Sequence, residues 1–474
     1  MESEGGAGIR LARAEPHLVI CPLRLVLSIV SLALFALPCP ARSIVPYRIT
    51  LPSGLRLIVV SQPGARLAAV EVRVRVGSAM ETPANNGGAH LIEHLVFKGG
   101  DNGKPGEIDA AVEALGGELT ARTSRESTRY ATVVPPANAV KALEIIAGML
   151  LHPAFRPDDI ANEKIVIAGE SADSDSEPAR SGYSDLAATA FDADDADRLP
   201  LMGSPETLAT LDHIAVKSLH GQWYQPENMT VVVVGDIKAD DLVPTATRLF
   251  PASATIPPLP IASPPTGVPV QFDGVTRAPL RPRSRQLDSG LATVFFAFSG
   301  PSADDIARLP AIDTLLPLLA AGGDRGRLGH ALVGGEKSAL SVGAEFLPGR
   351  LGGLIILSAT GPREDAARLE SGLLAAVIAL RESPATDSEV ANARAHALSE
   401  VEYGDTVPAG LARRLADEDA RGVPPTVADS YPDRVRLVTA DAVRALIEQY
   451  LTPTRRTVAV IGVAAKTPPV DSAR

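Results

Sequence analysis

An internal repeat constrains the fold of this 474-residue chain more than any other feature of its sequence. The segments 223–235 and 450–462 share an aromatic residue, a proline, a β-branched run and a closing glycine. The matching positions recur at one constant spacing: Pro226 with Pro453, Thr230 with Thr457, and Gly235 with Gly462. The segment 291–298 likewise resembles the segment 68–76. The repeat predicts an α+β fold of two homologous domains, each an antiparallel sheet with helices packed on one face.

The length and composition agree with two globular domains, because 474 residues exceed what one core supports. We predict an N-terminal domain over 45–250, a Pro-rich linker over 251–285 and a C-terminal domain over 286–465. Nine prolines between positions 251 and 282, without periodic pattern, indicate the linker. The formal net charge of −11 argues against a nucleic-acid partner, which would require a basic surface.

Residues 1–41 have the organisation of a signal peptide. Three arginines precede an apolar run over 25–37, which is short for a membrane span, and small residues follow, so we expect cleavage after Ala41. Export, with the bacterial periplasm as destination, is the resulting expectation. The alternatives are an uncleaved anchor and a lipoprotein modified at Cys39, although Pro38 fits the latter poorly. Both cysteines lie in this leader, so thiolates are not expected as metal ligands.

The segment 87–95 carries the most specific chemical motif, with His90, Glu93 and His94 in the order H-x-x-E-H. On a helix the two histidines lie one turn apart on the same face, so both imidazoles reach a single metal ion. This order is the inverse of H-E-x-x-H, and its chemistry is zinc-assisted hydrolysis, with Glu93 close enough to contact a water on the metal. The alternative is a pair of ordinary surface or core histidines.

Three further segments have clear local patterns. The segment 157–170 is predicted to be a helix on which Glu163 and Glu170, two turns apart, share a face; taken alone, they would be two solvated carboxylates. The segments 119–123 and 128–134 are predicted to be paired strands. The segment 69–76 alternates Val with Glu or Arg, which predicts a half-buried strand.

The segments 77–99, 116–126 and 163–170 together resemble the active-site region of the pitrilysin family (M16) of zinc peptidases, in the branch of the mitochondrial processing peptidase and its bacterial relatives. The resemblance covers most of the chain after the leader, more weakly in the second half. It implies a mitochondrial-processing-peptidase-like fold and a Zn²⁺ cofactor held by His90, His94 and Glu170. It also implies catalytic roles for Glu93, as general base on a zinc-bound water, and for Glu163, as a second carboxylate near the metal.

The resemblance further implies that the strand containing Leu119, Thr120 and Ala121 binds the substrate. In the family this is an edge strand that pairs with the peptide backbone, so that main-chain hydrogen bonds supply the affinity. Family members usually carry Asn where this chain has Thr120. An ordinary hairpin is the alternative that the residues themselves leave open.

The function that follows is a zinc-dependent endopeptidase acting on short or unfolded polypeptides. Three protein ligands leave zinc one open position, as a catalytic site requires. The alternatives are a catalytically silent structural or assembly subunit of the same family and another metal hydrolase on the same fold. The segment 312–319, which matches the zinc helix in the second half, contains neither His nor Glu, so one metal site per chain is expected.

The second half lacks the donors that would stabilise an oxyanion in the family, an Arg and a Tyr. With Ser341-Val342 as anchor, Leu340 stands where Tyr is expected, and Val333 or Gly334 where Arg is expected. Neither position offers a side-chain donor. Three nearby basic residues are out of register: Arg325, Arg327 and Lys337. We therefore expect a hetero-oligomer in which a homologous, metal-free subunit supplies the Arg and Tyr.

Overall fold

The computed structural model describes residues 45–100, 103–104, 106–191, 195–252, 272–278, 290–335, 337–349 and 352–462. The predicted signal peptide 1–41 and most of the predicted linker 251–285 lie outside these residues. Both sheets of the structure belong to one compact unit, Pro46–Arg474. Among the helices described, none has the length and apolar character needed to cross a membrane.

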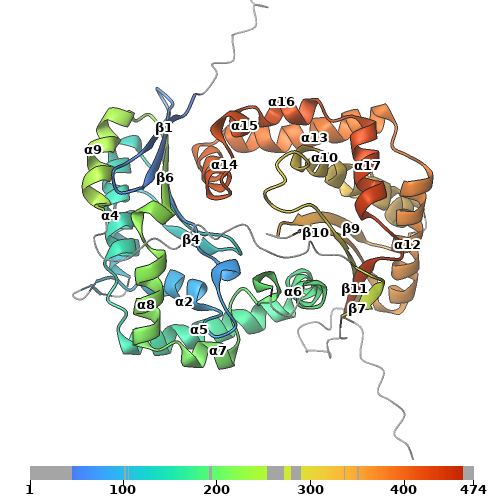
Figure 1. Cartoon of the computed structure of the whole chain (residues 1–474), viewed down its shortest axis with the longest axis horizontal. Helices are drawn as coiled ribbons and strands as arrows, with labels where there is room; N and C mark the ends of the chain where they lie inside the picture. The colour runs from blue at the N-terminus through green and yellow to red at the C-terminus, as the bar shows by residue number, and fades with distance from the viewer. Residues whose placement is uncertain are drawn as a thin grey trace, which may run out of the picture. The chain divides into compact units, whose positions relative to one another are not determined.

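The first sheet, as far as the chain is described, has six strands in the order β1-β2-β6-β3-β5-β4 (Figure 1). Its strands are β1 (Tyr47–Thr50), β2 (Arg56–Ser61), β3 (Ala68–Val74), β4 (Thr120–Thr123), β5 (Thr128–Val134) and β6 (Met229–Gly235). The pair β2 and β6 is parallel and the other pairs are antiparallel. The short strand β4 therefore lies at an open edge of a largely antiparallel sheet.

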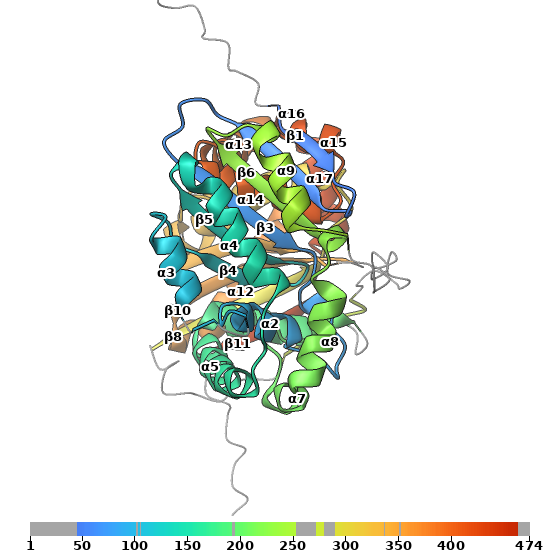
Figure 2. The ribbon, with the colours of Figure 1, turned by 90° about the vertical axis from the view of Figure 1, so that its left-hand side faces the viewer.

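Most helices of the first half pack on one face of this sheet and bury the main core there, whereas α6 (Pro178–Ala190) packs on the sheet of the other half. The helices are α2 (Gly88–Val96), α3 (Glu107–Glu113), α4 (Ala139–Leu151), α5 (Pro157–Ser176), α6 (Pro178–Ala190), α7 (Pro205–Thr210), α8 (His213–Trp223) and α9 (Ala239–Leu249). Helix α5 begins at Pro157 with two aspartates in its first turn, where proline and acidic side chains are both favourable. In Figure 2, α4 lies across the sheet, and α2 and α5 lie close together below it.

The second sheet repeats the first with five described strands in the order β7-β11-β8-β10-β9. They are β7 (Val275–Arg277), β8 (Leu291–Ser299), β9 (Ser341–Leu347), β10 (Leu354–Pro362) and β11 (Arg456–Ile461). Strand β7 lies within the predicted linker, yet it pairs in parallel with β11. The helices of this half are α10 (Leu309–Ala320), α11 (Arg327–Gly329), α12 (Ala366–Glu382), α13 (Asp387–Asp405), α14 (Pro408–Ala420), α15 (Pro425–Asp429), α16 (Tyr431–Arg436) and α17 (Ala440–Tyr450), with a π-helical turn over His330–Gly335.

Each half also lends one helix to the sheet of the other half. Helix α14 packs on β3 and β6, and α6 packs on β8 and β11 (Figure 1). Small and aliphatic side chains form the first of these contacts: Leu411, Ala412, Leu415 and Ala416 against Ile58, Val60, Ala69, Val232 and Val234. The predicted pair of α+β domains with helices on one face is confirmed, and the second face of each sheet is covered by the partner half.

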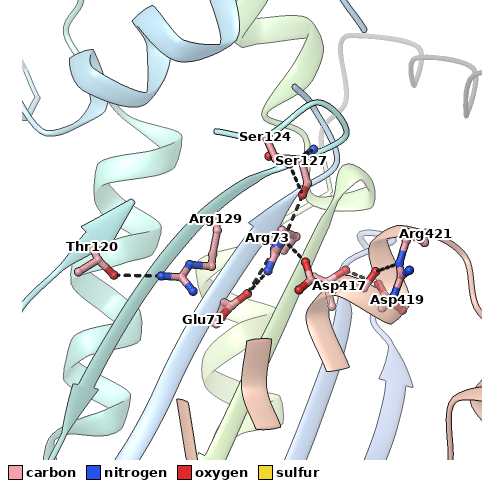
Figure 3. A network of polar contacts seen from close by, with 10 residues as sticks. Glu71, Arg73, Thr120, Ser124, Ser127, Arg129, Asp417, Asp419 and Arg421 are labelled. Carbon is pink, nitrogen blue, oxygen red and sulfur yellow. Dashed lines mark hydrogen bonds and ion pairs between the residues drawn. The ribbon is translucent and has the colours of Figure 1, made fainter. Parts of the chain in front are cut away.

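This exchange corrects the expectation that the segment 69–76 forms a half-buried strand. All seven residues of β3 are buried, including Glu71 and Arg73. Arg73 forms ion pairs with Glu71 and with Asp417 of α14, and it donates to Ser127 Oγ (3.1 Å) (Figure 3). Val–Glu–Val–Arg alternation is the pattern of a strand with one wet face, but here α14 covers that face and supplies the compensating charge.

We predict that Leu415→Ala destabilises the protein by about 2–5 kcal/mol, the usual cost of truncating a buried leucine. The measurement is the midpoint of urea-induced unfolding. Leu437→Ala is the matched control, because that side chain is 76% exposed and its truncation should change stability by less than about 0.5 kcal/mol. Equal midpoints for the two variants would contradict the packing of α14 on the first sheet.

Candidate metal centre

A buried carboxylate, Glu81, fixes the start of helix α2. Its Oε1 accepts from the Ala89 amide (2.8 Å), and its Oε2 accepts from the Gly87 amide (2.9 Å) and Asn86 Nδ2 (2.7 Å). A carboxylate at a helix N-terminus is stabilised by the exposed amides and the helix dipole, although burial raises the pKa of Glu81. Gly87 has φ +90°, and a Cβ there would meet the backbone of Met202 at 2.8 Å. These constraints place His90 and His94 in a fixed position.

His90, His94 and Glu170 come together between α2 and α5. Glu170 Oε2 lies 3.7 Å from His90 Nε2 and 3.6 Å from His94 Nε2. The three ligand atoms lie within 4.8 Å of one another, and they form the one such group among the residues that the structure describes. The structure thus brings together the three predicted metal ligands from two helices. His94 and Glu170 are 76 positions apart in the sequence.

Glu163 lies on the same side of α5 and contacts both His94 and Lys98. Its Oε2 is 2.9 Å from His94 Nδ1, and its Oε1 is 2.6 Å from Lys98 Nζ. Burial opposes ionisation of Glu163, but the hydrogen bonds from Lys98 and His94 outweigh it and lower the pKa of this carboxyl. This contact at Nδ1 orients the His94 ring, and its Nε2 then lies on the side of Glu170.

The donor set fits a zinc ion. Burial, with a contribution from His94, lowers the pKa of His90 to about 4, so its imidazole is neutral at pH 7. His90 Nε2, His94 Nε2 and a carboxylate oxygen of Glu170 therefore lie around one point, an arrangement that a cation between them would stabilise. Zinc bonds of about 2.0–2.2 Å would separate tetrahedral ligand atoms by about 3.3–3.6 Å, close to the two distances found. His90 Nδ1 is buried without a hydrogen-bond partner among the described residues.

Glu93 lies between α2 and the edge strand β4. Its side chain is buried, and its Oε2 accepts a hydrogen bond from Thr123 Oγ1 of β4. Burial raises the pKa of Glu93, and the Thr123 bond opposes this rise. Thr123 and Glu81 were not predicted from the sequence. Thr123 contacts a residue that is distant in sequence, and Glu81 caps α2 from outside the usual capping spacing. The one signal in the sequence for Thr123 was its place at the end of the strand predicted over 119–123.

The predicted substrate-binding residues lie at the start of the open edge. Leu119 is buried and precedes β4, Thr120 is exposed and donates to the Ala131 carbonyl (3.1 Å), and Ala121 pairs with Tyr130. In the described part of the sheet, β4 has β5 on one side and no strand on the other. The predicted hairpin and the edge position are therefore present, whereas a role in substrate binding stays a prediction.

The second half has no corresponding donor cluster in its described residues. Helix α10 carries Asp313, whose buried carboxyl accepts a hydrogen bond from Tyr431. Arg327 donates to both oxygens of Glu389 (2.9 Å each) and to the Ser383 carbonyl, so its guanidinium is committed to the start of α13. Leu340 is 64% exposed, and its apolar side chain has no hydrogen-bond donor.

Two solved structures share this arrangement of two α+β halves. A protease from Helicobacter pylori has a TM-score of 0.78 at 22% identity, covering 88% of this chain and 99% of that one. A peptidase M16 inactive domain from Pseudomonas fluorescens has a TM-score of 0.78 at 15% identity, covering 90% and 100%. At such identities the likeness concerns the fold alone, a pair of α+β halves.

Sequence comparison leads to the family itself. The insulinase (peptidase family M16) model matches residues 56–203, and the peptidase M16 inactive domain model matches residues 210–396. The chain belongs to peptidase family M16.

Its curated relatives include proteins named as zinc proteases. An uncharacterized zinc protease of Mycobacterium tuberculosis is 33% identical over 211 residues, which are 44% of this chain and 48% of that protein. An uncharacterized zinc protease of Bacillus subtilis is 30% identical over 203 residues, 43% and 49% of the two chains. A protein of Arabidopsis thaliana named for mitochondrial-processing peptidase subunit beta is 30% identical over 201 residues, 42% and 38%. The matches span about half or less of these relatives.

Proposed function

We propose that the chain is a zinc-dependent endopeptidase that hydrolyses peptide bonds in short or unfolded polypeptides. The observation that carries this proposal is the convergence of His90, His94 and Glu170 beside Glu93 and the open edge of β4. Membership of peptidase family M16 and the zinc-protease names of its relatives support it. A silent structural subunit would have no need to retain all these side chains in one arrangement.

His90 and His94, through Nε2, and Glu170, through its carboxylate, would hold the ion, while Glu163 orients the His94 ring. Zinc, when bound, supplies Lewis-acid polarisation of a carbonyl and acidifies water. The Glu93 carboxylate accepts the proton of the attacking water and later delivers it to the leaving amine nitrogen. Thr123 Oγ1, by its hydrogen bond to Glu93 Oε2, holds that carboxylate in position.

The open edge of β4 is suited to bind the peptide as an added strand. Its backbone N–H and C=O groups would pair with the peptide main chain along Leu119, Thr120 and Ala121, so binding would depend little on side chains. Because Thr123 at the other end of β4 contacts Glu93, a peptide on this edge passes the general base. This geometry supports cleavage of extended, unfolded chains.

The active unit would contain a second, homologous subunit without metal. The positions where the oxyanion donors are expected hold Leu340 and Val333 or Gly334, and Arg327 is committed to Glu389. A partner that supplies an Arg and a Tyr would complete the site. The name of the Arabidopsis relative, a subunit beta, supports an assembly of unlike chains in this family.

The test is to assay the zinc-loaded chain against an unfolded polypeptide, alone and then mixed with a similar-sized M16 relative from the same source. We expect weak cleavage alone and an increase of about 10²–10³-fold with the partner, which is the typical contribution of an oxyanion donor. Full activity of the lone monomer would contradict the two-subunit proposal. Absence of cleavage in both assays, with zinc bound, would favour the structural-subunit alternative.

A further inference from the structure

Three arginines lie side by side across the outer strands of the first sheet. Arg73 of β3 pairs directly with Arg129 of β5, and Arg129 pairs directly with Arg122 of β4. Side chains alternate along a strand, so these three point away from the face on which Thr123 contacts Glu93. They form a row of guanidinium groups on the face that α14 partly covers.

The ion pairs of this row lie at its inner end. Arg73 forms ion pairs with Glu71 and Asp417 (Figure 3). Arg129 donates a long hydrogen bond of 3.5 Å to the neutral Thr120 hydroxyl, and its Nε is buried without an acceptor in the described structure. Its charge acts on Glu71, where it offsets part of the rise that burial causes in the pKa of that carboxyl, but it forms no ion pair there among the described residues. Arg122 is exposed at the edge, with no hydrogen-bond or ion-pair partner among the described residues. Like charges placed directly opposite each other on a sheet repel, so an anion beside the outer two would be stabilised.

A cavity of about 490 Å³ opens on this face beside β4. Arg129 and Thr120 contribute to its wall, together with Gly117 and, from α14, Ala409. Of the acidic side chains that also line or adjoin it, Glu71 is paired with Arg73, and Glu118 is exposed two residues before the start of β4. Arg129 brings a positive charge to the cavity wall, and Arg122 lies directly opposite Arg129 in the sheet, next to that wall.

We propose that Arg122 and Arg129 form a carboxylate-binding subsite that selects an acidic side chain in the bound peptide. The inference rests on the proposed function, in which the peptide adds to the edge of β4. In such a pairing, the peptide residue opposite Arg122 points to the same face as Arg122. Its neighbour, opposite Thr123 or Ala121, points toward Glu93 and the metal ligands. The selected Asp or Glu thus lies within two positions of the bond that is cut.

The experiment compares peptides that carry Glu, Gln or Lys at single positions around a common cleavage site. The first readout is kcat/KM of the wild-type chain, in the complex if a partner is required. The second is affinity for the zinc-loaded Glu93→Gln chain, measured by fluorescence anisotropy. At one position within two residues of the cut, Glu should exceed Lys by about tenfold in both readouts, the size expected for one charge-assisted contact.

Charge reversal at Arg122 gives the decisive comparison. Arg122→Glu should invert the Glu-to-Lys ratio at that position, and Arg122→Gln should bring it close to one. The matched control is Arg66→Glu, an exposed arginine in the turn before β3, which should leave the ratio as in the wild type. Arg122 is exposed, so these variants should fold, and circular dichroism verifies this.

An unchanged ratio in Arg122→Glu, or an equal change in Arg66→Glu, would overturn the subsite. If the wild type cleaves none of the peptides, the proposed function fails, whereas the anisotropy comparison still decides the subsite. A Glu preference that Arg122→Glu inverts in that comparison supports it, and binding without preference refutes it.

Discussion

Glu93→Gln should reduce peptide hydrolysis by about 10²–10⁴-fold while leaving one zinc bound per chain. Glutamine has nearly the shape of glutamate, and its carbonyl oxygen still accepts the hydrogen bond from Thr123. It cannot take a proton from water at neutral pH, so the loss concerns the proton transfer alone. The measurements are kcat on an unfolded polypeptide and the zinc content of the purified variant.

The control for this variant is Glu113→Gln. Glu113 is exposed on α3, so this substitution makes the same chemical change at the surface. It should leave both activity and zinc content as in the wild type. Turnover of Glu93→Gln close to that of the wild type would show that another group is the base. Loss of zinc from Glu93→Gln would show that this side chain contributes to metal binding, contrary to the assignment.

His90→Ala and Glu170→Ala should each lower the zinc content from about one ion per chain to nearly none. Each variant leaves two of three protein ligands, and a catalytic zinc site normally requires three. The measurement is the zinc-to-protein ratio after dialysis against metal-free buffer, with thermal unfolding as a check that the chain still folds.

His396→Ala is the matched histidine control, because His396 is exposed on α13 of the second half, away from the cluster. Its zinc content should equal that of the wild type. Retention of a full equivalent of zinc by His90→Ala would show that the cluster of His90, His94 and Glu170 is not the metal site.

Much of the candidate site was accessible from local sequence, because helix geometry is periodic. The spacing of His90 and His94 and the seven-residue spacing of Glu163 and Glu170 determine which side chains share a face, and the structure brings these faces together. The internal repeat similarly predicted two α+β halves. The positions of the hairpin strands followed from alternation and turn residues.

Tertiary structure decided what depends on neighbours far along the chain. The alternation in β3 could not reveal that α14, more than 300 residues later, covers its polar face and pairs with Arg73, so a half-buried strand was expected. Glu81 anchors α2 from beyond the usual capping spacing, and Thr123 meets Glu93 only after the sheet has formed.

The alignment of the three arginines also depends on tertiary structure and not on local sequence. Arg73, Arg122 and Arg129 are unremarkable in the sequence, where each alternates with apolar or hydroxyl residues. Their alignment arises from the registers of two strand pairs, and a shift of one residue in either would turn a side chain to the opposite face. The sequence by itself determined the metal-binding motif, because its spacing is local. Only the fold decided what surrounds that motif, because register and helix packing depend on the whole chain.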